Sequence, residues 1–234
     1  MSAIIREERI GGQRLILGDS LAVMQEIGRF DAVVTDPPYG IGEGNAKNLT
    51  RGGLAAPRNY AGTDGWDDKP ASAEHIKAIR DCSKHQIIFG GNYFDGLGPT
   101  SCWLVWDKQN GDNDFADCEL AWTNLPKAVR RIYWRWNGMI RKGDDVRVHP
   151  TQKPLGVMEW CLNHLPKGAQ TVLDPFAGSG TTLVACQRLG LLGTGVERDP
   201  EFFDIACRRV DEATRQADLF ITQASILTQE AMDV

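Results

Sequence analysis

The sequence has no long hydrophobic run and no closely spaced pair of cysteines. Its longest apolar stretches, such as Gln86-Ile-Ile-Phe89, are far shorter than the roughly 20 residues that a membrane-spanning helix needs. The first residues soon become charged and contain no apolar core of a signal peptide, so the expected location is cytoplasmic, with no membrane partner. The six cysteines include no C-x-x-C pair, which favours reduced thiols in the core over disulfides or a metal site.

An excess of positive charge is also absent from the chain as a whole. The formal net charge of the 234 residues is −5, which taken alone argues against a nucleic-acid partner. Between Pro126 and Lys153, however, eight basic and only two acidic residues give a net charge of +6. A basic segment on an acidic body produces a directional field, and this field matters more for binding than the net value does.

Short apolar segments alternate with stretches of helical length along most of the chain, which predicts one mostly parallel, doubly wound α/β sheet with helices on both faces. The segments 119–122 and 131–134 could pair as a hairpin. The other expected strands are 14–17, 31–35, 86–89, 101–106, 171–173 and 192–196, and the expected helices are 20–27 (capped by Ser20), 72–84, 154–165, 181–189 and 200–216.

Polar residues follow the expected strands at the points where ligands bind to such sheets. Asp19, Asp36, Gly90, Asp174 and Glu197 each stand at or next to the carboxyl end of a strand. The glycine-rich stretch 40–70 breaks the alternation, and a loop this long in a compact domain favours a role in closing over a substrate beside Asp36, with a plain surface loop as the alternative.

The first motif, Asp174-Pro-Phe-Ala-Gly-Ser-Gly-Thr-Thr182, lies between a strand and a helix. Gly178 and Gly180 allow a tight turn close to a ligand, and Thr181 and Thr182 can cap the helix. The lysine of a phosphate-binding P-loop and the third glycine of the dinucleotide fingerprint are both absent. Glu197 follows Asp174 by 23 residues, about where a carboxylate binds ribose hydroxyls. This pattern favours a nucleoside cofactor without a pyrophosphate.

The second motif is Thr35-Asp-Pro-Pro-Tyr-Gly40. Pro37 and Pro38 lack backbone donors and fix the chain, so the carbonyl of Pro37 and the carboxylate of Asp36 form two adjacent acceptors. Two such acceptors can bind both hydrogens of a planar exocyclic amine, and Tyr39 can stack on the ring that carries it. A rigid turn at the end of a strand is the structural alternative.

Together these motifs resemble the DNA amino-methyltransferases that use S-adenosylmethionine (SAM), specifically their permuted beta group. Asp36-Pro-Pro-Tyr39 matches the catalytic motif, the Asp174 motif matches the SAM loop, and His149-Pro-Thr-Gln-Lys-Pro154 looks like the segment that precedes it. The resemblance covers about residues 14–212 and implies a seven-stranded, Rossmann-like methyltransferase sheet. The segment between Trp122 and His149, where the group usually carries its target-recognition region, is short.

The resemblance implies roles at matching positions, with His149 left as a structural or loop-anchoring residue. Asp36, Pro37, Pro38 and Tyr39 are expected to bind and activate a flipped base in double-stranded DNA. The single domain would comprise a catalytic half (14–122), a basic recognition segment (123–148), a SAM-binding half (149–216) and a tail (217–234). SAM is expected to contact Asp19, Asp36, Lys153, Asp174, Phe176, Gly178, Ser179, Gly180, Thr181, Thr182 and Glu197.

The basic segment interleaves cations with aromatic residues, which favours contact with DNA. The alternative is a strand whose Tyr133, Trp134 and Trp136 are partly core and whose arginines are solvated. A short or degenerate target sequence is expected unless a homodimer or the 40–70 loop adds base contacts. The expected DNA-binding residues are Arg130, Arg131, Arg135, Arg141, Lys142 and Arg147.

The identity of the methylated group remains to be decided among several alternatives. The Asp at position 36 resembles adenine-N6 enzymes, whereas cytosine-N4 enzymes more often carry Ser there. Protein-glutamine methyltransferases share related chemistry, but they start the motif with Asn and place the SAM loop first. A DNA-binding module that keeps SAM as a structural ligand would be expected to have a damaged Asp36 motif, and here that motif is intact.

Overall fold

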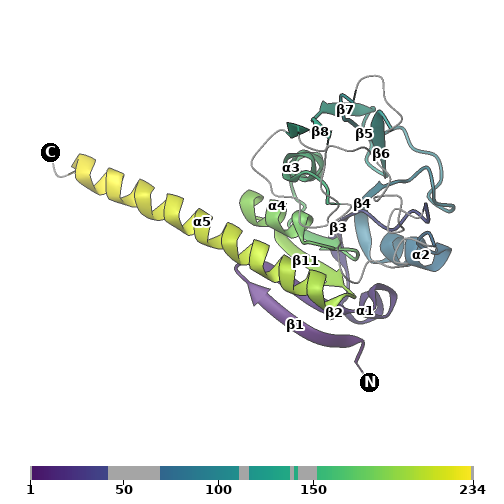
Figure 1. Ribbon diagram of the computed structural model, residues 1–234, viewed down its shortest axis with the longest axis horizontal. Helices are drawn as coiled ribbons and strands as arrows, with labels where there is room; N and C mark the ends of the chain where they lie inside the picture. Colours follow the sequence, from purple (N-terminus) through teal and green to yellow (C-terminus); the bar gives the residue numbers. More distant parts are fainter. Residues whose placement is uncertain (1, 42–68, 111–115, 138–139, 142–151, 233–234) are drawn as a thin grey trace, which may run out of the picture.

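One large mixed sheet organises the part of the chain that the computed structural model describes, namely residues 2–41, 69–110, 116–137, 140–141 and 152–232 (Figure 1). Its nine strands follow the order β1-β2-β11-β10-β3-β4-β6-β5-β7. They are β1 (Ile4–Ile10), β2 (Gln13–Gly18), β3 (Phe30–Thr35), β4 (Ser83–Phe89), β5 (Trp103–Asp107), β6 (Cys118–Thr123), β7 (Arg130–Tyr133), β10 (Thr171–Asp174) and β11 (Leu192–Glu197).

The centre of the sheet is parallel, because β2, β11, β10, β3 and β4 pair with one another in the same direction. Strand β10 lies between β11 and β3, so the two halves of the chain interleave. The predicted doubly wound α/β fold is therefore confirmed, although the sheet has nine strands in the described residues rather than seven.

Helices cover both faces of this sheet. Helices α3, α4 and α5 pack on one face and α1 and α2 on the other (Figure 1). In β3, Ala32 and Val34 pack toward α3 while Val33 packs toward α1 and α2, as expected for a strand buried on both sides. The helices are α1 (Ser20–Glu26), α2 (Ala73–Asp81), α3 (Leu155–Leu162), α4 (Thr181–Leu189) and α5 (Pro200–Met232).

Several local expectations were wrong. Strands β6 and β7 do not form a hairpin: β6 pairs antiparallel with β4 and β5, and β7 pairs parallel with β5 at the edge of the sheet. The cap of α1 is Asp19, whose carboxylate accepts from the backbone N–H of Ala22, rather than Ser20. The edge strand β1 and the short pair β8 (Trp136–Asn137) and β9 (Ile140–Arg141) were not predicted, and α5 continues well past the expected end at residue 216.

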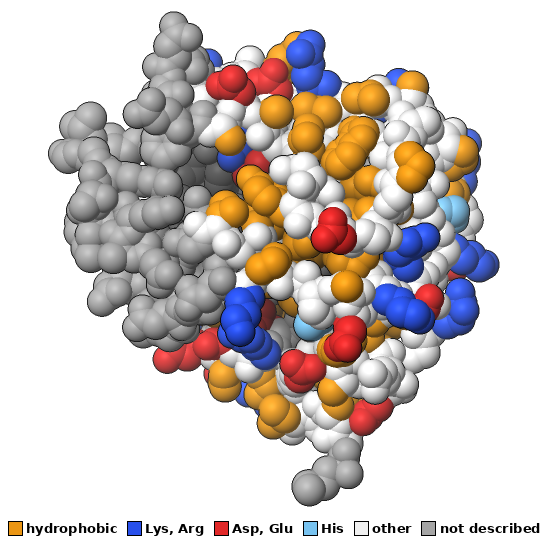
Figure 2. Space-filling view, turned by 90° about the vertical axis from the view of Figure 1, so that its right-hand side faces the viewer, with side chains coloured by type: hydrophobic (Ala, Val, Ile, Leu, Met, Phe, Trp, Pro, Cys, Tyr) orange, Lys and Arg blue, Asp and Glu red, His pale blue; other side chains and the backbone are white. Residues whose placement is uncertain are grey.

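The cysteines lie where core thiols are expected. Four of them are buried, and all six are free, with burial raising the pKa of Cys82 to about 11. In the described part of the chain, we find no helix with the length and apolar content needed to cross a membrane. On the face shown in Figure 2, hydrophobic side chains gather near the middle, and acidic and basic side chains are mixed around them.

Candidate active site

The carboxyl ends of the central strands meet at one edge of the sheet and bring the predicted site residues together. Asp19 and Asp36 directly follow β2 and β3, and Glu197 and Asp174 are the last residues of β11 and β10, so the four acids line this edge in the strand order β2-β11-β10-β3. The hydroxyl of Thr35 donates to Asp174 Oδ1 at 2.7 Å. This hydrogen bond joins the end of β3 to the start of the predicted SAM loop. The two motifs identified in the sequence are therefore neighbours.

The predicted SAM loop runs from β10 to α4 through two left-handed glycines. Gly178 and Gly180 have φ of +52° and +78°, a region that residues with a Cβ rarely adopt. A Cβ at Gly180 would lie 2.9 Å from the Cβ of Ala206 on α5, so close helix packing also requires this glycine. The loop thus needs its glycines for backbone shape and for packing.

Most side chains of this loop bind protein groups. Burial raises the pKa of Asp174 to about 6, while its carboxylate accepts from Thr182 at 2.5 Å and from the backbone N–H of Phe176 at 3.1 Å. Arg209 donates to Ser179 and Thr181 at 3.0 Å each. Asp174, Ser179, Thr181 and Thr182 are all buried, so these contacts shape the loop.

Glu197 is placed to serve both the loop and a ligand. Its Oε2 accepts from the backbone N–H of Gly178, and its Oε1 accepts from those of Arg198 and Asp199, each at 2.8 Å. Burial raises the pKa of Glu197 to about 7, and the three backbone donors oppose that rise. The carboxylate therefore sits against the glycine turn, where a nucleoside hydroxyl could share it.

A histidine that sequence reasoning missed stands beside the predicted cofactor residues. The ring of His75 on α2 lies 5.6 Å from that of Phe176, and the charge of Asp19 acts on it. Ser72 Oγ lies 2.8 Å from His75 Nδ1, and burial lowers the pKa of this histidine. Asp19, Phe176 and His75 thus form an acidic and aromatic wall next to the loop, with a chemistry that fits an adenine ring.

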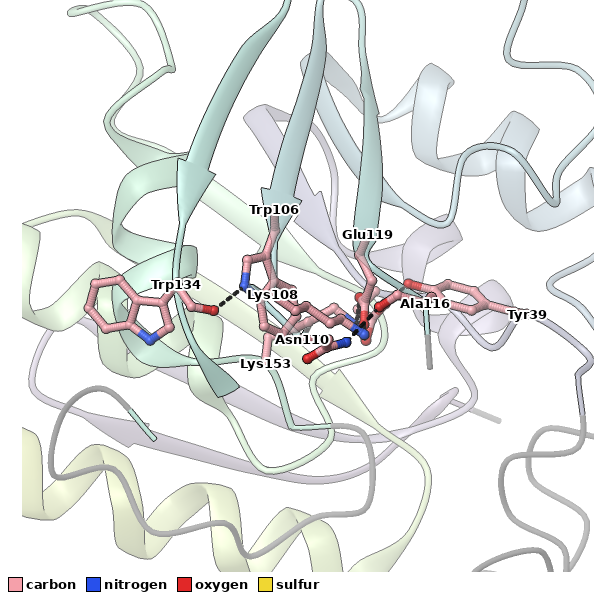
Figure 3. Close-up of polar contacts among 9 residues, drawn as sticks. Tyr39, Trp106, Lys108, Asn110, Ala116, Glu119, Trp134 and Lys153 are labelled. Atoms are coloured by element: carbon pink, nitrogen blue, oxygen red, sulfur yellow. Dashed lines mark hydrogen bonds and ion pairs between the residues drawn. The ribbon is translucent and has the colours of Figure 1, made fainter. Parts of the chain in front are cut away.

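The Asp36 carboxylate is held by two groups. Tyr39 donates its hydroxyl to Asp36 Oδ1 at 2.5 Å, and Lys153 donates its ammonium to Oδ2 at 2.5 Å. Lys153 also pairs with Glu119 at 3.0 Å, and Lys108 pairs with the other oxygen of Glu119 at 2.6 Å (Figure 3). Lys153, predicted as a cofactor contact, therefore lies between Asp36 and Glu119. The sequence did not reveal that Glu119 and Lys108 belong to this cluster.

Burial and charge act in opposite directions within this cluster. Burial raises the pKa of Asp36, and Lys153 limits that rise. Burial also acts to raise the pKa of Glu119, but Lys153 and Lys108 outweigh it and bring this pKa to about 2. The pKa of Lys153 is raised overall, because Asp36 and Glu119 outweigh the effect of burial. The cluster therefore pairs two basic side chains with two acidic ones.

The ring of Tyr39 is fixed by the loop that follows β4. Its ring stacks on Tyr93 with centroids 5.0 Å apart and planes at 14°, and Phe94 meets it edge-on. A Cβ at Gly90 would lie 2.1 Å from Tyr39 Cε1, so only glycine allows this approach. The carbonyl of Pro38 accepts from the backbone N–H of Ala71 at 3.0 Å and fixes the end of the motif.

The predicted DNA-binding residues are only partly described. Arg130, Arg131 and Arg135 are exposed on or just after the edge strand β7, and Arg131 stacks over Tyr133 at 4.4 Å. Trp134 packs against the core, which bears out part of the structural alternative. For Arg141 only the backbone is described, and Lys142, Arg147, His149 and most of the 40–70 loop lie outside the described residues.

The chain is similar in sequence to known DNA methyltransferases. Residues 99–208 match the family model N6_N4_Mtase, described as DNA methylase. The type II methyltransferase M.HpaI of Haemophilus parainfluenzae is 24% identical over 240 residues, which covers 85% of this chain and 74% of that protein. The type II methyltransferase M2.LlaDCHI of Lactococcus lactis subsp. cremoris is 37% identical over 79 residues, 33% of this chain and 29% of the relative.

Two solved structures share the fold. The M1.HpyAVI–SAM complex superimposes with a TM-score of 0.54 at 24% identity, covering 84% of this chain and 99% of that one. The PvuII DNA methyltransferase, described as cytosine-N4-specific, gives a TM-score of 0.56 at 14% identity, covering 88% and 89%. Over residues 99–208 the chain is thus similar to the N6/N4 DNA methylases, and it shares its fold with these two DNA methyltransferases; the comparisons do not distinguish adenine from cytosine.

Proposed function

We propose that the protein transfers a methyl group from SAM to the N6 amine of an adenine flipped out of double-stranded DNA. The observation that carries this proposal is the Asp36 carboxylate, which directly follows β3 beside the glycine loop and is bound by Tyr39 and Lys153. An acid at this position resembles adenine-N6 enzymes, as noted above.

The chain's residues fit SAM at the edge of the sheet. Glu197 can accept from ribose hydroxyls, the Gly178 turn allows close approach, and Asp19, Phe176 and His75 can enclose the adenine ring. The bound cofactor supplies an electrophilic methyl group on a sulfonium. The site needs to bring the target nitrogen into line with that methyl and to keep water away from it.

The Asp36 motif supplies the electrostatic part of the reaction. An exocyclic amine is a poor nucleophile because its lone pair is delocalised into the ring. When the Asp36 carboxylate and the Pro37 carbonyl accept from both amine hydrogens, the nitrogen moves toward tetrahedral geometry. These acceptors also stabilise the positive charge that develops on it, and an interaction that strengthens in the transition state raises the rate. Tyr39 would stack on the extruded base.

Transfer to DNA is tested with methyl-labelled SAM. We expect label in duplex DNA from several genomes and none in protein or RNA incubated in parallel. DNA that stays unlabelled, whatever its source, would overturn the proposed activity, and label in protein glutamine would favour the alternative class of enzyme.

Removing the Glu197 carboxylate is expected to weaken SAM binding. Glu197→Ala should cost on the order of 1–3 kcal/mol, the scale of hydrogen bonds to a charged group. Because hydroxyls donate best to the ionised form and the pKa of Glu197 is raised to about 7, SAM affinity in the wild type should rise with pH through neutrality. Calorimetry across that range should show the rise, and Glu197→Gln should abolish it. A pH-independent affinity in the wild type would contradict the assignment.

The exposed arginines of the β7 edge are proposed to contact DNA phosphates. Changing Arg130, Arg131 and Arg135 together to alanine should lower the salt slope of DNA binding by roughly 0.9 for each lost contact and weaken all sequences alike. The matched control changes Lys77, Arg80 and Lys84, three exposed cations on and near α2, and should leave the slope nearly unchanged. An unaltered slope in the first variant would move the DNA surface elsewhere.

A further inference from the structure

Four buried or half-buried charges form a chain that ends on the catalytic carboxylate. Lys108 follows β5, Glu119 lies in β6 and Lys153 precedes α3 (Figure 3). Asp36 follows β3, so four segments distant in sequence meet here. The side chain of Lys153 is only 8% exposed. Ion pairs this far from water are costly to assemble, and their loss is more damaging than that of surface pairs.

The contact between Lys153 and Asp36 raises a problem for catalysis. A lysine that neutralised Asp36 alone would compete with the amine for the carboxylate and would repel the positive charge that develops on the amine nitrogen. Glu119 holds the same ammonium from another side at 3.0 Å, and its negative charge offsets that of Lys153. Charges in such a site interact more strongly than in water.

Glu119 is itself fixed and kept ionised by its surroundings. Lys108 pairs with its second oxygen at 2.6 Å and lies 5.1 Å from the centre of the Trp106 ring. The indole N–H of Trp106 donates to the carbonyl of Trp134 at 2.8 Å. The ring of Trp134 in turn packs against Gly156, three residues after Lys153, where a Cβ would collide with it. The far end of the charge chain is thus anchored in packed aromatic residues.

We propose that Glu119 is a positioning residue for methyl transfer, which draws the ammonium of Lys153 toward itself so that the Asp36 carboxylate stays available to accept from the base amine. This inference rests on the proposed function for its catalytic consequence, but the effect of Glu119 on Asp36 is a property of the protein alone. Among the described residues, the ionisable groups that act on Asp36 or are acted on by it are Lys153, Glu119, Tyr39 and Asp174.

The test compares Glu119→Gln, which keeps the shape of the side chain, with the wild type at saturating SAM and DNA. We expect kcat to fall by at least about tenfold, and the acid limb of its pH profile to move to lower pH. The direction follows because the negative charge of Glu119 raises the pKa of Asp36, so its removal leaves Lys153 to make Asp36 more acidic. Glu119→Asp, which keeps the charge, should restore part of both effects.

The control is Glu159→Gln, which breaks another carboxylate–cation pair, to Arg188, away from Asp36. It should leave kcat and the pH profile unchanged. The position of a pH limb does not depend on how much of a variant is folded, so partial misfolding does not obscure it. If Glu119→Gln does not fold, Glu119→Asp is compared with the wild type instead. A smaller shift of the acid limb is then expected.

A second readout needs no methyl transfer. Titration of the Asp36 carboxyl carbon by NMR, in the protein without SAM or DNA, should give a lower pKa in Glu119→Gln than in the wild type. If the wild type does not transfer methyl groups, the proposed function is wrong. The titration would still show whether Glu119 acts on Asp36. An unchanged Asp36 titration, or a loss of kcat with no shift of the acid limb and no rescue by Glu119→Asp, would reduce Glu119 to a structural role and overturn the proposal.

Discussion

Asp36→Ala is expected to reduce methyl transfer by on the order of a hundredfold to a thousandfold or more, the effect of losing a group that stabilises transition-state charge. SAM affinity should stay within a few-fold of the wild type. The reason is spatial: Asp36 follows β3, whereas the groups that hold the cofactor loop and can meet the ribose are Asp174 and Glu197, on β10 and β11. A transfer assay and calorimetry with SAM measure the two effects separately.

The variant also leaves Lys153 with Glu119 as its remaining carboxylate, so a loss of stability must be separated from a loss of chemistry. Asp36→Asn keeps the size of the side chain and should be nearly as inactive. Asp95→Ala removes an exposed acid on the loop after β4 and should behave as the wild type. Full activity in folded Asp36→Ala would remove this residue from catalysis.

Gly90→Ala is expected to lower kcat at least tenfold by displacing Tyr39. The added Cβ would stand 2.1 Å from Tyr39 Cε1, a separation that forces the ring to move. The backbone offers little relief, because Gly90 donates to the carbonyl of Leu120 and accepts from the N–H of Tyr93, both at 2.8 Å. Since Tyr39 also donates to Asp36, its displacement disturbs the carboxylate as well. Steady-state kinetics and thermal unfolding measure the two consequences.

Gly96→Ala is the control that separates the effect of this collision from the effect of backbone strain. Gly90 and Gly96 have φ of +66° and +86°, so alanine at either position costs about 1–2 kcal/mol of conformational strain. Nothing lies within 4 Å of a Cβ at Gly96. The two variants should therefore lose similar stability from strain, and only Gly90→Ala should lose activity. Equal kinetics in both would show that the approach of Gly90 to Tyr39 is unimportant.

The parallel centre of the fold could be predicted because its strands are short, apolar and separated by helices, which leaves few other arrangements. Strands β6 and β7 could not be placed in the same way. Their sequences do not reveal direction, and β6 runs antiparallel, so its beginning rather than its end lies at the catalytic edge. Glu119 lies at the beginning of β6, and for this reason it was not placed at the site from the sequence. An acidic residue in an otherwise apolar strand could have indicated a functional role.

The residues of the site were predicted from sequence motifs. Which group each side chain contacts, however, depends on tertiary structure. Asp174 belongs to the cofactor motif, yet its carboxylate is occupied by Thr35, Thr182 and a backbone N–H. Lys153 belongs to the segment before the loop, yet its ammonium lies between two carboxylates from other strands. Neither partner set can be read from spacing along the chain.

The most direct test of the account is the identity of the modified base. DNA incubated with the protein and SAM is digested to nucleosides, which are separated and identified by mass spectrometry, with Asp36→Ala as the blank. We expect N6-methyladenine that depends on Asp36. N4-methylcytosine in its place would contradict the proposal that this site receives adenine.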